Sequence, residues 1–134
     1  MAILGAAAFS VVYGLLQKGP FFGLVYNRSY QTLVLLIIVY PIIEELAFRG
    51  FIQTSLVKMA YLRTSFVCIS IANTVTSIIF SAFHLIHHDV IWAVLIFVPS
   101  VVFGFFRDKY DSVKPSIILH IIYNGFYYLL FGGV

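Results

Sequence analysis

Residues 31–57 read QTLVLLIIVYPIIEELAFRGFIQTSLV, a long apolar run with charged residues inside it. The run is too long for a strand and long enough for a membrane-spanning helix, which needs about 20 mostly apolar residues. Three charged residues nevertheless stand within it: Glu44, Glu45 and Arg49. Because a charge at the centre of a membrane helix costs roughly 2.5–3.5 kcal/mol, these three residues require partners or a function.

The composition places the whole chain in a membrane. Of 134 residues, 62% are hydrophobic and 10% are charged, against about 45–50% and about 25% in soluble domains. The basic residues lie singly between apolar runs and form no stripe, which excludes a nucleic-acid partner and favours membrane lipid. The only cysteine, Cys68, lies in an apolar run and is expected to be a small buried residue.

The apolar runs predict an all-α fold. We expect one membrane-embedded domain, residues 1–134, that forms a polytopic transmembrane helical bundle of about five spans. No alternation with a period of two residues indicates a strand. The fourth span is expected to be broken by Pro99. The five expected spans are residues 2–17, 31–57, 64–86, 90–106 and 116–131.

The charges in the second span separate by their spacing. Glu45 and Arg49 are four residues apart with the acid first, which is the favourable order for an ion pair within a helix. Glu44 lies about 100° further round the helix. One carboxylate is therefore expected to be neutralised by Arg49, and the other to face different groups. A purely structural tie between Glu45 and Arg49 is the alternative.

Further polar groups come from two other spans. Phe80 and His84 are four residues apart in the third span, and His120 and Asn124 have the same spacing in the fifth. A carboxylate, two imidazoles and an amide that face one another can hold a water, with the carboxylate as base and the amide as donor to developing negative charge. The alternatives are an interfacial role for His84 and an interhelical hydrogen-bond pair for His120 and Asn124.

A metal site is a further alternative. His84, His87 and His88 have spacings that resemble those of ligands, and with Glu44 they could build a zinc site. No HExxH sequence is present, and His87 and His88 fall in a loop beside Asp89. We therefore expect no cofactor, with zinc as the alternative.

The residues resemble a known family. EELAFRG at 44–50 is similar to the EExxxR motif of the CAAX prenyl endopeptidase and bacteriocin-processing family (CPBP, or Abi) of intramembrane proteases. FSAFH at 80–84 is similar to its FxxxH motif, and HIIYN at 120–124 to its HxxxN motif. The motifs occur in the family's order, and the resemblance covers about residues 31–131.

The resemblance implies a glutamate-dependent endopeptidase, a hydrolase embedded in the membrane. Glu44 would activate water, His84 would assist that water, and His120 with Asn124 would stabilise the oxyanion. Glu45, Arg49 and Phe80 would support the site, which is expected to be metal-free. The chain has fewer spans than is common in the family, so it is expected to be a minimal core or a fragment.

The resemblance also bears on substrate and location. The expected substrate is a membrane-associated protein or peptide, either prenylated at a CAAX sequence or a bacteriocin-like peptide. The chain is expected to be a multi-pass integral protein of a bacterial cell membrane. The alternative function is non-catalytic: membrane binding or self-immunity to a bacteriocin.

Overall fold

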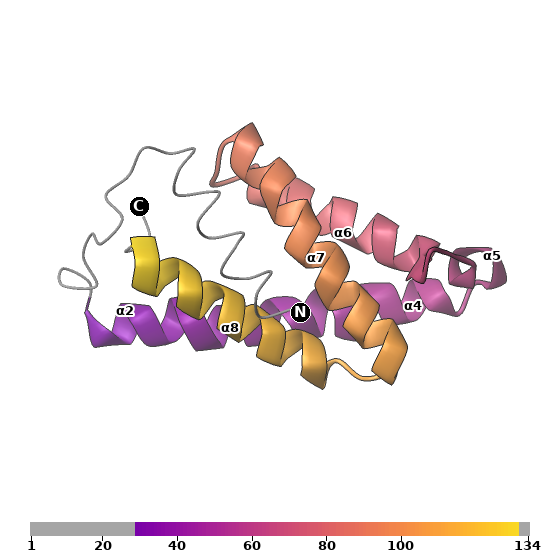
Figure 1. Ribbon diagram of the computed structural model, residues 1–134, viewed down its shortest axis with the longest axis horizontal. Helices are drawn as coiled ribbons and strands as arrows, with labels where there is room; N and C mark the ends of the chain where they lie inside the picture. The colour runs from indigo at the N-terminus through magenta and orange to yellow at the C-terminus, as the bar shows by residue number, and fades with distance from the viewer. Residues whose placement is uncertain (1–28, 132–134) are drawn as a thin grey trace. The chain divides into compact units, whose positions relative to one another are not determined.

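The computed structural model describes residues 29–131, which are mainly helical (Figure 1). The chain forms two compact units. One unit is Glu44–Ile117, and the other joins Met1–Ile43 to Ile118–Val134. The first expected span, 2–17, and the three residues after Phe131 lie outside the described residues.

The charged stretch lies in one continuous helix, Tyr30–Val57, as predicted. The hydroxyl of Ser29 caps its start by accepting from the backbone N–H of Thr32. Two stretches of the helix have the wider π-helical pattern, which in proteins is frequent at functional sites. In chain order the segments are α2 (Tyr30–Val34), η2 (Leu35–Val39), α3 (Tyr40–Glu45), η3 (Leu46–Gln53) and α4 (Thr54–Val57).

The prediction for residues 64–70 was wrong. A short helix, α5 (Ala60–Arg63), is followed by an antiparallel hairpin of two-residue strands, β1 (Ser65–Phe66) and β2 (Ile69–Ser70). The two residues of its turn, Val67 and Cys68, both have positive φ, as tight hairpin turns require. Cys68 is exposed rather than buried, because it occupies this turn.

Helix α6 (Ile71–His84) and helix α7 (Val90–Tyr110) complete the unit Glu44–Ile117. The hydroxyl of Ser70 caps α6, and the carboxylate of Asp89 caps α7. Contrary to the expected break, α7 continues through Pro99. A membrane-protein helix tolerates an internal proline where neighbouring elements satisfy the backbone, and Pro99 is buried.

Helix α7 turns back along α6, and the two pack closely (Figure 1). Asn73 donates from Nδ2 to the Val101 carbonyl at 3.0 Å and accepts from Ser77. Gly104 makes this approach possible, since a Cβ there would lie 1.9 Å from the Asn73 Oδ1. Asn73 therefore ties α6 to α7.

The last helix, α8 (Lys114–Phe131), occupies the expected fifth span. Within residues 29–131, Tyr30–Val57 and Val90–Tyr110 are long and apolar enough to cross a membrane. Helix α6 is apolar but shorter. The structure thus supports the expected all-α class and two of the expected spans by length and composition.

Candidate functional site

The guanidinium of Arg49 is the centre of the candidate site. Arg49 lies in η3 and is fully buried, as is Glu45 one turn before it. Its Nε lies 3.4 Å from Glu45 Oε2, so the expected ion pair is present. Its Nη2 donates to both the carbonyl (2.8 Å) and the hydroxyl (2.7 Å) of Ser100 in α7.

Aromatic rings enclose the same guanidinium. The Cζ of Arg49 lies 4.9 Å from the ring centre of Phe80 in α6 and 6.0 Å from that of Phe103 in α7. Phe48, next to Arg49 in the chain, packs edge-on against Phe80 with ring centres 4.9 Å apart. The two contacts of Arg49 with Phe80 and Phe103 are cation–π interactions, which strengthen when the cation is desolvated. They join η3, α6 and α7 around one buried charge.

His84 ends α6 and is linked to Phe80. The two rings lie 4.6 Å apart, and His84 Nδ1 lies 2.8 Å from the Phe80 carbonyl oxygen. Because a carbonyl can only accept, Nδ1 must be the protonated nitrogen. In the neutral ring, Nε2 is then the nitrogen that accepts a proton.

The neighbouring histidines continue from His84 as a ladder of rings. His88 stacks on His84 with ring centres 6.0 Å apart, and Trp92 follows at 5.3 Å. Burial lowers the pKa of His88, the adjacent His87 lowers it further, and Asp89 opposes both effects. Among residues 29–131, no three His, Cys, Asp or Glu side chains are grouped so that they could hold a metal ion.

Glu44 and Glu45 differ in their surroundings. Glu45 is buried, whereas Glu44 is half-buried at the end of α3. Both carboxylates interact electrostatically with Arg49, Glu45 more strongly than Glu44. The structure therefore links Glu45, Arg49, Phe80 and His84 by successive contacts, and Glu44 shares the field of the same guanidinium.

His120 and Asn124 belong to the other unit, which joins Met1–Ile43 to Ile118–Val134. His120 is buried in α8. The Asn124 amide donates to the Leu36 carbonyl in η2 at 2.9 Å. In η2 the Tyr40 N–H donates to the carbonyl five residues earlier, that of Leu35. The next such bond would join the Pro41 nitrogen to the Leu36 carbonyl, but proline has no N–H. Asn124 thus supplies the hydrogen that Pro41 lacks.

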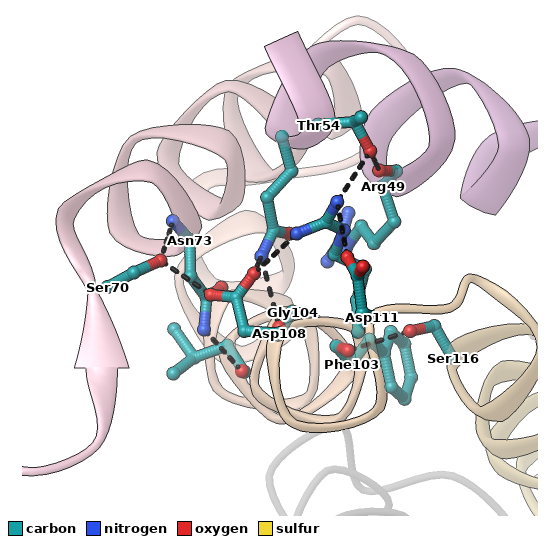
Figure 2. A network of polar contacts seen from close by, with 12 residues as sticks. Arg49, Thr54, Ser70, Asn73, Phe103, Gly104, Asp108, Asp111 and Ser116 are labelled. Carbon is teal, nitrogen blue, oxygen red and sulfur yellow. Dashed lines mark hydrogen bonds and ion pairs between the residues drawn. The ribbon is translucent and has the colours of Figure 1, made fainter. Parts of the chain in front are cut away.

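A second polar network lies one turn further along η3 (Figure 2). Gln53 donates from Nε2 to the Gly104 carbonyl (3.0 Å) and to Asp108 Oδ1 (2.8 Å). Asp108 also accepts from the hydroxyl of Ser70 at 2.6 Å and from Arg107 at 2.9 Å.

Arg107 links this network to Arg49. It also donates to the hydroxyl of Thr54, and that hydroxyl donates to the Arg49 carbonyl. This network fixes the backbone that carries Arg49.

Several of these residues were not predicted. Gln53 had a signal, since Glu45, Arg49 and Gln53 follow one another at intervals of four residues on one face. Ser100 had a weaker signal as the only hydroxyl between Val90 and Phe106. A serine in an apolar helix more often bonds to its own backbone, so its partner could not be inferred from spacing.

The described residues form a mainly helical protein with two helices long and apolar enough to cross a membrane and a buried Glu–Arg pair in a series of contacts with a histidine. A profile described as type II CAAX prenyl endopeptidase Rce1-like matches residues 26–126. The match covers most of the chain, which therefore belongs to this family, as the motifs predicted. The family implies CAAX-type intramembrane protease activity. Comparisons with curated proteins and with solved structures find no match.

Proposed function

We propose that the chain is an endopeptidase that hydrolyses a peptide bond within the membrane with water activated by Glu44. The observation that carries the proposal is the series of contacts Glu45–Arg49–Phe80–His84. It joins two of the three family motifs through a single buried cation. A structural tie would need only the Glu45–Arg49 pair and not the contacts that extend the series to His84.

In the proposed reaction, the Glu44 carboxylate takes a proton from water as its oxygen attacks the scissile carbonyl carbon. His84 Nε2 accepts a hydrogen bond from the second O–H of that water and so orients it. The Phe80 carbonyl supports this role because it keeps the proton of neutral His84 on Nδ1. Two acceptors on one water leave a lone pair of its oxygen directed at the substrate.

Attack produces a tetrahedral oxyanion, for which His120 and Asn124 are the proposed donors. An amide nitrogen has two hydrogens, so Asn124 can bind Leu36 through one and the oxyanion through the other. Collapse of the intermediate breaks the C–N bond, and Glu44 returns its proton to the leaving nitrogen. Glu45 and Arg49 keep the charge of the site balanced. No metal takes part.

The proposed substrate is a peptide with a prenylated CAAX terminus, as the family description suggests. A lipid-anchored peptide reaches a site in a multi-pass membrane protein by lateral diffusion, which suits the apolar, lipid-like surface of this chain. The proposed location is a bacterial cell membrane. A bacteriocin-like peptide remains the second substrate class to test with the same variants.

The test uses the full chain in liposomes with a farnesylated peptide that ends in Cys-aliphatic-aliphatic-X and carries a quenched fluorophore. We expect Glu44→Gln to reduce cleavage by at least about 10³-fold, because a general base and its charge are lost together. Asp111→Asn removes an exposed carboxylate and serves as the matched control. Wild-type cleavage rates in Glu44→Gln would refute the mechanism.

A further inference from the structure

We infer that Ser100 is a positioning residue that acts on the two carboxylates through Arg49. The inference rests on the proposed function, because it assigns Ser100 a role in the same reaction. Ser100 belongs to none of the motifs that indicated the site. It directly follows the buried Pro99 in α7, and its own side chain is fully buried.

The hydrogen bonds of Arg49 are one-sided. Within residues 29–131, Nη2 donates two short bonds to Ser100, while Nε and Nη1 make no hydrogen bond of normal geometry. The contact between Nε and Glu45 Oε2 is longer, at 3.4 Å. Hydrogen bonds to a charged group are directional and strong, whereas ion-pair attraction and stacking on Phe80 depend weakly on orientation. Ser100 therefore sets the rotation of the guanidinium.

The position of the guanidinium in turn governs the carboxylates. Arg49 interacts electrostatically with both Glu45 and Glu44. At low dielectric, this interaction changes steeply with distance. A small displacement of the Arg49 guanidinium would thus change the field at the proposed base without removing any charge from the site. Activated groups tolerate such displacement poorly, since misplacement by about 1 Å can cost about 10²-fold in rate.

Ser116 provides a matched control. Its hydroxyl is also fully buried, and it donates to a carbonyl of α7, that of Phe103, at the same 2.7 Å. It makes no hydrogen bond to Arg49. Ser100→Ala and Ser116→Ala therefore each remove one buried hydroxyl bond of equal length. Only the first removes a bond to the guanidinium, which keeps its bond to the backbone carbonyl of residue 100.

The kinetic test uses the liposome assay with the farnesylated peptide. We expect Ser100→Ala to lower kcat about tenfold, equivalent to about 1.4 kcal/mol, with KM unchanged. Ser100→Thr should restore kcat, and Ser116→Ala should leave it at the wild-type value. Equal kcat losses in Ser100→Ala and Ser116→Ala, or none in Ser100→Ala, would overturn the inference. If Glu44→Gln abolishes cleavage and Ser100→Ala does not affect it, the inference about Ser100 fails while the proposed function stands. If Glu44→Gln cleaves normally, the proposed function fails.

A second measurement needs no substrate. The chain has four arginines, so ¹⁵N NMR of their guanidinium groups in micelles is tractable, with Arg49→Lys identifying the Arg49 signal. We expect rotation about the Arg49 Nε–Cζ bond to be slow in the wild type and in Ser116→Ala, and at least several-fold faster in Ser100→Ala. Equal rotation rates in all three proteins would reject Ser100 as the residue that holds Arg49.

Discussion

At the scale of single residues, Arg49 joins η3 to α6 and α7. It is fully buried, pairs with Glu45, stacks on Phe80 and donates twice to Ser100. A buried cation with one carboxylate and two oxygen acceptors is compensated, whereas a buried carboxylate that loses its cation is not. The pair is thus costly to break, even if forming it adds little to stability.

Arg49→Met should lower the free energy of unfolding by about 3–5 kcal/mol, because it leaves Glu45 charged in a buried site. Unfolding by SDS in mixed micelles measures this loss. The double variant Glu45→Gln/Arg49→Met should recover part of it, since the residues are coupled. Additive losses from the two single changes would contradict a direct interaction.

His88 predicts a dependence of stability on pH. Burial and His87 lower its pKa below the usual 6.5, and Asp89 only partly compensates. The unfolded chain then binds a proton more readily than the folded chain as the pH falls below about 6.5, so acid favours unfolding. Above that pH the effect is absent, since His88 is neutral in both states.

The expected result is a melting temperature in micelles that falls between pH 7 and pH 5. The His88→Gln variant should show a smaller fall over the same range. His87→Gln should show an intermediate fall, because it keeps the His88 ring but removes one of the two groups that lower its pKa. An identical pH profile for the wild type and His88→Gln would contradict this assignment.

At the scale of the elements, the contact between α6 and α7 depends on a missing side chain. A Cβ at Gly104 would meet Asn73 Oδ1 at 1.9 Å, Asn73 Cγ at 2.4 Å and Gln53 Oε1 at 2.9 Å. Moving these side chains disturbs buried hydrogen bonds, because Asn73 Oδ1 accepts from Ser77 and the Gln53 amide donates to the Gly104 carbonyl. Two polar tethers therefore meet at one glycine.

Gly104→Ala should destabilise the protein by about 3 kcal/mol, at the upper end of overpacking effects, plus the cost of any bond it breaks. SDS unfolding again provides the measurement. Gly50→Ala is the matched control, since a Cβ at Gly50 meets its nearest neighbour at an ordinary 3.8 Å. A loss in Gly50→Ala as large as that in Gly104→Ala would show that helix propensity, and not packing, is responsible.

At the scale of the whole molecule, the sequence predicted what depends on pattern. The apolar runs 31–57, 90–106 and 116–131 predicted the helices that the structure has at Tyr30–Val57, Val90–Tyr110 and Lys114–Phe131. The order of the motifs predicted the family. The ion pair of Glu45 and Arg49 followed from spacing within one helix. These features are local or periodic, so a single amino-acid sequence is sufficient to recognise them.

What the sequence could not predict depends on tertiary contact. The bond from Arg49 to Ser100 joins residues 51 positions apart, and no period relates them. The hairpin was missed because Val67 and Cys68 replace the glycine or asparagine that usually indicates such a turn. The continuity of α7 through Pro99 was missed because burial against neighbours outweighs the intrinsic preference of proline.

The hairpin turn also makes the unmodified chain convenient for spectroscopy. Cys68 is the only thiol in the sequence, and it is exposed at the turn beside the exposed Phe66 and Val67. A maleimide fluorophore or a nitroxide will therefore attach at one defined point, with no engineered cysteine and none to remove. The relative accessibility of that nitroxide to oxygen and to a water-soluble relaxation agent then measures how deeply the turn lies in the membrane.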